Sequence, residues 1–352
     1  MLSLRIENFS KTSFPISTAW LLGECMEARG KQDLWTRQRP EVLAALRERA
    51  IIQSAESSNR IEGVTVPKER LAPVVLGRSQ PRDRSEEELA GYRQALDWIF
   101  SRKFPVTMEA EVILHFHAMA QGGFSGDAGQ WKARDNEIIE FLPNGERIVR
   151  FRPTSAQDIP AAIRELCENY RAICDDASIP PLLAVATFVF DFLCIHPFRD
   201  GNGRVSRLLT TFLLQQHGFH VGGYVSLERI VEDSKEDYYR VLGECSRGWH
   251  EGTNPIVPWW NYFLGFVRRA YQEFGSQVES AGKGANGGAK SELIRNAVLS
   301  QVGPFTLTDI TGQLPSVSEQ LIRKVLGDMK KAGDLHLTGR GRGARWEVTR
   351  QG

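Results

Sequence analysis

The chain has 352 residues, of which 41% are hydrophobic and 25% charged, and 44 basic residues against 43 acidic ones give a formal net charge of +1. This composition is typical of a globular protein of two or three domains, and only a local patch of charge would indicate a polyanionic partner. No apolar run reaches the roughly 20 residues of a membrane span. The first residues lack a signal-peptide pattern, and five cysteines without a CxxC pair predict reduced thiols, no zinc site and a cytoplasmic protein.

Residues 1–100 predict an N-terminal helical region. Apolar spacing and helix-ending signals indicate a short helix within 15–30, a second over 40–54, a third over 54–63 and a fourth over 85–100. The third is expected to end near Gly63, before Pro67. Its last turns read Ser58-Asn-Arg-Ile-Glu-Gly63.

Residues 101–275 predict a second, mainly helical region that contains one hairpin. A helix is expected to begin at Thr107, and others are expected over 159–170 and from Pro181. Between the first two helices, two strand-like runs over 137–142 and 147–152 flank Pro143-Asn-Gly145, which is a hairpin signal. From the residues alone, this is either an ordinary surface hairpin or part of a site.

The most informative stretch runs from His196 to Arg207 and reads HPFRDGNGRVSR between two apolar runs. Its glycines leave backbone N–H groups free to converge on an anion, and a helix that starts near residue 202 would direct its positive dipole end there. Arg204 and Arg207 lie one helical turn apart, so both are expected to face that anion. Asp200 suits a Mg²⁺ ion that bridges phosphates, and His196 suits a neutral base. The residues therefore predict a polyphosphate site.

This stretch resembles the pattern H-x-F-x-[DE]-G-N-G-R-x-x-R of Fic (Fido) domain proteins at every fixed position. The resemblance implies a mainly α fold with a Fic-type helical core over 101–275 and the hairpin as a flap beside the active site, where it aligns a target segment by strand addition. It also implies transfer of AMP from ATP to a Tyr, Thr or Ser hydroxyl of a target protein or of the chain itself. His196 would be the general base and Asp200 the Mg²⁺ ligand.

The resemblance also assigns residues to ATP and to its control. The ATP-binding positions would be Gly201, Asn202, Gly203, Arg204, Val205, Ser206, Arg207, Asp233, Tyr238 and Tyr239. The backbone of the Gly-Asn-Gly turn would cradle phosphates with help from the Asn202 side chain, and a tyrosine would contact adenine. Ser58 and Glu62 match the inhibitory motif S/T-x-x-x-E-G/N. Glu62 would pair with Arg207 in the place of the γ-phosphate, in an inhibitory helix over about 54–63.

The C-terminal residues predict a separate domain. Residues 276–290 are rich in Gly and Ser and predict a linker. Residues 291–352 then show three helical runs and a strand pair around Gly339-Arg-Gly-Arg-Gly343, an order that resembles a winged helix-turn-helix. From Leu321 to Arg350, eight Lys/Arg face three Asp/Glu, so this domain either contacts DNA phosphates or mediates protein contacts or dimerisation. The few base-reading side chains slightly favour the second.

Two other functions fit the same motifs. A nucleotide-sensing, DNA-binding regulator would use the Fic region without transferring AMP. A de-AMPylating enzyme would use the same site in reverse, with Glu62 positioning a water. The family also implies possible homodimers, although the residues show no interface signal.

Overall fold

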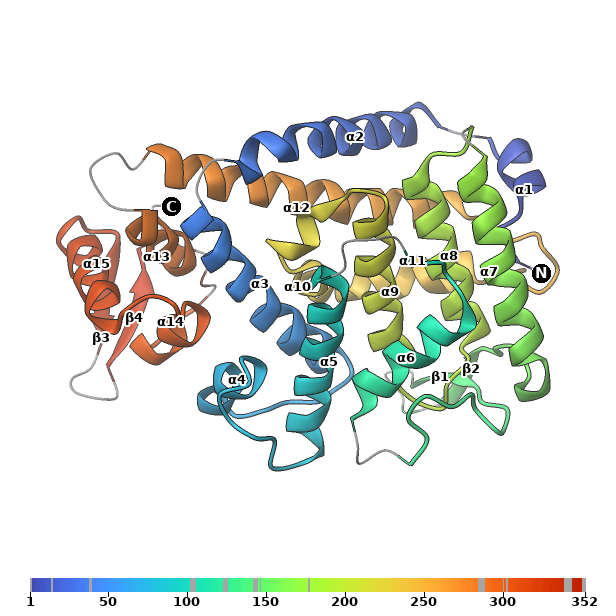
Figure 1. Ribbon diagram of the computed structural model, residues 1–352, viewed down its shortest axis with the longest axis horizontal. Coiled ribbons are helices and arrows are strands. Elements are labelled where there is room, and N and C mark those ends of the chain that lie inside the picture. Colours follow the sequence, from blue (N-terminus) through green and yellow to red (C-terminus); the bar gives the residue numbers. More distant parts are fainter. Residues whose placement is uncertain are drawn as a thin grey trace.

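The computed structural model describes residues 2–13, 15–37, 40–101, 106–122, 126–141, 145, 147–176, 178–283, 289–299, 301, 303–338 and 344–349. The described chain is mainly helical (Figure 1), as the sequence predicts. The helices before the site motif are α1 (Ile6–Lys11), α2 (Ile16–Thr36), α3 (Pro40–Ile61), α4 (Lys68–Val75), α5 (Arg84–Ser101), α6 (Ala110–Gln121), α7 (Ile159–Asp175) and α8 (Pro181–Ile195). Those after it are α9 (Asn202–Gln216), α10 (Leu227–Asp233), α11 (Lys235–Cys245), α12 (Val257–Lys283), α13 (Ala289–Leu299), α14 (Leu307–Gln313) and α15 (Glu319–Lys331).

Helix α8 forms the centre of the larger core. Every residue from Leu182 to Ile195 is buried, and α7, α9 and α12 pack directly against it. One polar group interrupts this apolar helix: Asp191, whose carboxylate accepts hydrogen bonds from the backbone of Ser3 and Leu4 and from the indole of Trp249. Burial raises the pKa of Asp191 to about 6, against the opposing effect of these donors. The N-terminal segment of the chain is thus attached to the central helix.

The N-terminal helices are longer than the sequence predicts. The two helices expected over 40–54 and 54–63 form one continuous helix, α3, which brings its last turn to the motif. The helix expected within 15–30 extends to Thr36, since it lies along the long helix α12 (Figure 1). The prediction that Thr107 caps the next helix is wrong, because α6 begins at Ala110 with Glu109 at its N-cap.

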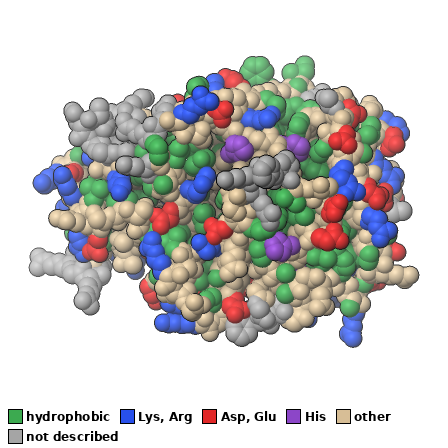
Figure 2. Space-filling view, viewed as in Figure 1, with side chains coloured by type: hydrophobic (Ala, Val, Ile, Leu, Met, Phe, Trp, Pro, Cys, Tyr) green, Lys and Arg blue, Asp and Glu red, His purple; other side chains and the backbone are tan. Residues whose placement is uncertain are grey.

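The outer face of α2 carries exposed apolar side chains beside the exposed Glu27–Lys31 ion pair. Ile16, Trp20 and Leu34 are 88%, 71% and 63% exposed, respectively. Figure 2 shows hydrophobic side chains along the upper edge of the molecule, where α2 runs in Figure 1. Among the described residues, no helix combines the length and apolar content needed to cross a membrane.

The expected hairpin is present as β1 (Ile138–Phe141) and β2 (Arg147–Phe151), which pair antiparallel. The pairing shifts register between Ile138 and Ile139, and Glu140 then lies opposite Ile148. Pro143 and Asn144 of the expected turn lie outside the described residues, whereas Gly145 has the positive φ of 81° that a turn glycine favours.

The C-terminal elements form their own core. Helices α13, α14 and α15 pack around Ile294, Phe305, Ile322 and Leu326 with the antiparallel strands β3 (Leu335–Thr338) and β4 (Arg345–Val348). A bridge from Phe305 to Trp346 adds a third extended segment. The order of elements is the one that the sequence predicts, while the expected basic turn at 339–343 lies outside the described residues. The expected linker at 276–290 is helical at its start, because α12 continues to Lys283.

Candidate active site

The site lies at the junction of α8 and α9. His196 caps α8 and has φ 52°, the only positive φ of a non-glycine residue among those described. Its N–H bonds to the carbonyl of Phe192 at 2.9 Å. A residue other than glycine in the left-handed conformation costs roughly 1–2 kcal/mol. Such backbone strain is concentrated at functional sites. The strain therefore supports a functional assignment for His196.

The surroundings of His196 keep its imidazole neutral. Burial, assisted by the positive charge of Lys132, lowers its pKa to about 4. Its Nδ1 atom is buried without a hydrogen-bond partner in the described part of the chain. Lys132 is itself only 5% exposed, and burial lowers the pKa of its ammonium to about 8. The imidazole is therefore neutral at pH 7, the form in which a histidine can accept a proton.

Asn202 stabilises the loop after His196 rather than reaching for an anion. Its amide oxygen accepts from the N–H of Phe198 at 3.0 Å, and its amide nitrogen donates to the carbonyl of Phe198 at 2.8 Å. The Phe198 ring is fully buried and stacks on His117 with a centroid distance of 3.7 Å. In this structure the Asn202 side chain therefore holds the loop through the Phe198 backbone, and it does not take the expected place in a phosphate cradle.

The two glycines of the turn meet two different requirements. Gly201 has φ 83°, and a Cβ there would lie 2.8 Å from the side-chain nitrogen of Gln121. Gly203 lies in the first turn of α9, where a Cβ would lie 2.1 Å from the Glu62 carboxylate. A carboxylate oxygen therefore lies directly against the N-terminal backbone of this helix, the position that attracts anions.

Arg207 is held by Ser58 and Glu62. Its Nη2 donates to the Glu62 carboxylate at 2.8 Å and to the Ser58 carbonyl at 2.9 Å, and its Nε donates to the Ser58 hydroxyl at 2.9 Å. Arg207 is 6% exposed and Ser58 is fully buried. Burial would lower the pKa of Arg207, but the charge and hydrogen bond of Glu62, together with Tyr92 and Tyr238, raise this pKa above its ordinary value. The structure thus brings Ser58, Glu62 and Arg207 together.

Arg204 does not face the same place. Its guanidinium pairs at 2.9 Å with the carboxylate of Glu88 on α5, and both side chains are at most 2% exposed. It also donates to the carbonyl of Ala120 at 3.1 Å. The expectation that both arginines face one anion is therefore not met in this state, because a buried acid from another helix, which spacing along α9 does not reveal, pairs with Arg204.

Asp200 lies at the outer edge of the turn. Its carboxylate is 48% exposed, accepts from the N–H of Gly201 at 2.7 Å, and lies 3.3 Å from Arg84 and 3.5 Å from Arg204. Val205 is buried, and the Ser206 hydroxyl donates to the carbonyl of Gly203 at 2.8 Å, so both stabilise the first turn of α9 through packing and hydrogen bonding.

A cavity of about 140 Å³ opens beside these groups. Its lining includes Glu62, His196, Gly203, Arg207, Tyr238, Tyr239, Leu242, Ser246 and, from the hairpin, Ile138, Arg150 and Phe151. Burial raises the pKa of both tyrosines. Tyr238 and Tyr239 are thus part of this cavity. Asp233 is not, because it pairs with Arg229 at 2.8 Å and Arg269 at 2.9 Å in the wall of another cavity.

Three charged residues were not identified from the sequence. Lys132 precedes the hairpin and lies near His196, Arg150 on β2 donates to the carbonyl of Tyr239, and Glu88 on α5 pairs with Arg204. The Arg150 contact ties the hairpin to α11. Each partner pair is more than 60 residues apart in the chain, and the only signal in a single sequence is a charged residue within an otherwise apolar or strand-like segment.

Comparisons with known proteins agree with this fold and motif. Residues 107–214 match the model of the Fic/DOC family. A relative from Nematostella vectensis, named protein adenylyltransferase Fic, is 22% identical over 206 residues, which are 56% of this chain and 44% of the relative. The chain thus spans less than half the length of that curated relative.

Two solved structures share the fold. A Fic family protein from Desulfovibrio desulfuricans matches with a TM-score of 0.61 at 22% identity over 97% of this chain and 98% of that one. A Fic domain containing signaling protein from Bacteroides thetaiotaomicron matches with a TM-score of 0.61 at 22% identity, over 73% of this chain and 97% of that one. The protein therefore shares the fold of these Fic family structures, and its residues 107–214 match the Fic/DOC family model.

Proposed function

We propose that the protein transfers AMP from ATP to a hydroxyl group of a protein, and that Glu62 inhibits this reaction. The observation that carries the proposal is the position of the Glu62 carboxylate, which contacts both Arg207 and the backbone at Gly203. A carboxylate there occupies an anion site made by a helix N-terminus and a guanidinium. The γ-phosphate of ATP has the same requirements and would compete with it.

The reaction divides among the residues of the cavity. His196 takes the proton of the attacking hydroxyl while the oxygen of that hydroxyl forms a bond to the α-phosphorus. The bond from that phosphorus to the bridging oxygen breaks, and pyrophosphate leaves with its negative charge stabilised by the N-terminus of α9 and by Arg207 once Glu62 has moved. Tyr238 and Tyr239 offer aromatic surface to the base, and the hairpin offers backbone groups to the target segment.

Asp200 suits a magnesium ion in this scheme. Mg²⁺ binds proteins through one or two carboxylates and completes its coordination with waters and substrate phosphates, and the Asp200 carboxylate is half-exposed beside the turn. Arg84 would have to release it first. When bound, Mg²⁺ neutralises charge on the phosphates, while Asp200 fixes its place.

The test compares ATP labelled at the α-phosphate with ATP labelled at the γ-phosphate in the wild type, Glu62→Gly and His196→Ala. We expect label from the α-position alone, increased about tenfold or more by Glu62→Gly. A tenfold increase corresponds to about 1.4 kcal/mol of free energy by which Glu62 otherwise competes with the γ-phosphate. The change His196→Ala should lower the rate by roughly 10²–10⁴-fold, the usual contribution of a general base.

The control is Glu48→Gly, a loss of a carboxylate on the same helix that pairs with Arg78 and lines neither of the two cavities. Incorporation of label from the γ-position would mean that the protein transfers a phosphoryl group and not AMP. Equal labelling of the wild type and Glu62→Gly would contradict the inhibitory role of Glu62 but leave AMP transfer standing.

A further inference from the structure

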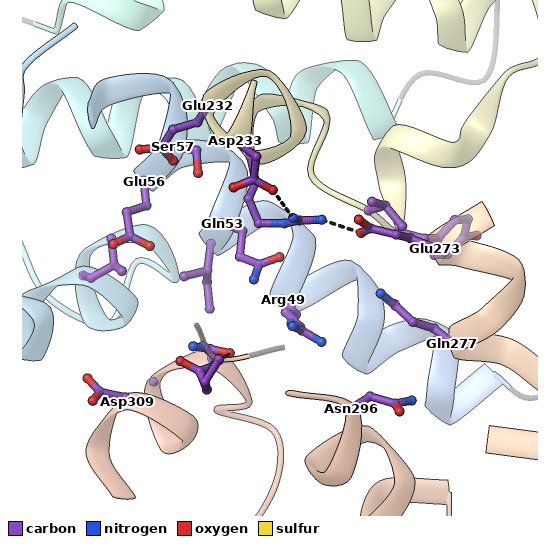
Figure 3. Close-up of a pocket in the computed structure, with 18 of the residues that line it drawn as sticks. Arg49, Gln53, Glu56, Ser57, Glu232, Asp233, Glu273, Gln277, Asn296 and Asp309 are labelled. Carbon is purple, nitrogen blue, oxygen red and sulfur yellow. Dashed lines mark hydrogen bonds and ion pairs between the residues drawn. The ribbon is translucent and has the colours of Figure 1, made fainter. Parts of the chain in front are cut away.

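A second, larger cavity lies behind the inhibitory helix. Its volume is about 1050 Å³, and α3, α4, α10 and α12 form its walls together with α13 and α14 of the C-terminal unit (Figure 3). This volume is slightly above the roughly 300–1,000 Å³ typical of small-molecule sites. The cavity shares neither His196 nor Arg207 with the site described above.

Helix α3 separates the two cavities. Ser58 and Glu62 contact Arg207, whereas Gln53, Ser57 and Arg60 line the larger cavity. At 100° per residue these two sets lie on opposite faces of one helix. A ligand in the larger cavity would therefore contact the helix that carries Glu62 without touching the candidate active site.

The charges around the larger cavity favour an uncharged ligand. Of its described lining residues, five are basic and five acidic. These groups already pair with one another: Arg229 with Asp233 and Glu273, and Arg269 with Asp233. Figure 3 shows the ion pairs that Asp233 and Glu273 make along one wall. A phosphate or carboxylate would have to displace these partners, at a loss of the ion pairs that it replaced.

Carboxamides supply the groups that are not engaged. Gln53 of α3, Gln277 of α12 and Asn296 of α13 line the cavity from three different elements (Figure 3). Their side chains make no hydrogen bond within the described part of the chain. A carboxamide offers a donor and an acceptor together, which matches the edge of a nucleobase. Leu71 and Ala72 of α4 add apolar surface for a ring.

We propose that this cavity is an effector site for an uncharged nucleoside. The carboxamides bind the base and hydroxyl edges, and the ligand connects α3 to α12 and to the C-terminal unit. Because α3 lines the cavity and leads directly to Glu62, a ligand that holds α3 in this position stabilises the arrangement in which Glu62 pairs with Arg207. The regulatory part of this inference rests on the proposed function.

The first test measures binding without activity. Hydrogen–deuterium exchange of the full chain is followed with and without adenosine, and separately guanosine, at about 1 mM, the weak end of specific binding. We expect one of the two to slow exchange in α13 and in α3, and Gln277→Leu to remove this protection. The control Gln320→Leu, which makes the same change on an exposed face of α15, should keep it. Protection confined to residues around His196, or none with either nucleoside, would overturn the inference.

The second test measures the effect on Glu62. Ser58→Ala weakens the hold on Arg207 and gives a measurable basal rate of auto-modification, which the nucleoside found to bind should lower by about fivefold, at the low end of allosteric coupling. The Glu62→Gly variant should not respond. Equal inhibition of both variants would mean competition with ATP and would refute the regulatory part. If no variant incorporates label, the proposed function fails, whereas the exchange result still decides the binding site.

Discussion

Arg204 and Arg207 lie one turn apart on α9 but belong to different kinds of ion pair. Arg204 and Glu88 are 1% and 2% exposed, and the acid comes from α5, which packs directly on α9. The Arg207 side chain is 7% exposed, but its partner Glu62 is 26% exposed and follows the last turn of α3. The first pair is therefore part of the core, and the second is placed where its acid can leave. Equal spacing along a helix does not give two arginines equal roles.

The largest expected effect comes from breaking the buried pair. Glu88→Ala leaves the Arg204 charge enclosed without its main partner, which typically costs about 3–5 kcal/mol. We expect a fall of that size in the free energy of unfolding, measured by urea denaturation. The matched control Glu87→Ala changes the neighbouring acid on the same helix. A loss below about 1 kcal/mol, the value of a surface pair, would show that Arg204 is not a core cation.

Breaking the second pair should change activity more than stability. Glu62→Gln keeps the shape of the side chain, removes its charge and leaves Arg207 bonded to Ser58. We expect auto-modification to rise, about tenfold for each 1.4 kcal/mol of weakened competition, with a change in unfolding free energy of about 1 kcal/mol or less. The same denaturation and α-label assays measure both. A large loss of stability without a gain of activity would make Glu62 structural.

The contrast also shows what a single sequence can reveal. Local chemistry predicts His196 and the Gly-Asn-Gly turn, whereas the Glu62–Arg207 pair, which joins residues 145 apart in the chain, is predicted only through the resemblance to Fic domain proteins. It does not reveal Glu88 or Lys132, whose contacts join segments far apart in the chain. The prediction that Asp233 lies in the ATP site fails for the same reason. Asp233 is close to the tyrosines in sequence, but it pairs with Arg229 and Arg269 in the wall of the larger cavity.

Helix ends are the other limit of the sequence. The helical runs expected over 40–54 and 54–63 join into one continuous α3, which packs on α5 and α10. Local propensity is a weak guide to helix ends when tertiary contacts decide. By contrast, the run from Leu182 to Ile195 is apolar on nearly every face, and a helix of that kind has no side to present to water. Its burial therefore follows from the amino-acid pattern alone.

The pH dependence should report the environment of His196. Burial and Lys132 lower the pKa of His196 from 6.5 to about 4. Between these two pH values His196 therefore binds fewer protons in the folded protein than in the unfolded chain. This group therefore makes the fold less stable as pH falls from 6.5 toward 4. We also expect the transfer rate of Glu62→Gly to stay constant from pH 7 to about 5, measured by initial rates of α-label incorporation. An acid limb centred near 6.5 would place His196 in water.

The smallest expected effect concerns Arg84, which bridges the two regions. Its guanidinium lies 2.8 Å from Glu88 and 3.3 Å from Asp200, and its side chain is 56% exposed. Arg84→Ala should therefore cost about 1 kcal/mol or less of stability, as exposed pairs do. It should also lower the Mg²⁺ concentration needed for half-maximal transfer, because Asp200 loses a competing cation. Arg93→Ala, which removes the partner of Asp97 from the same helix, is the control and should leave the Mg²⁺ requirement unchanged. If Arg84→Ala raises the Mg²⁺ requirement instead, Arg84 helps to orient Asp200, and the arginine that joins the core pair to the turn is then part of the metal site.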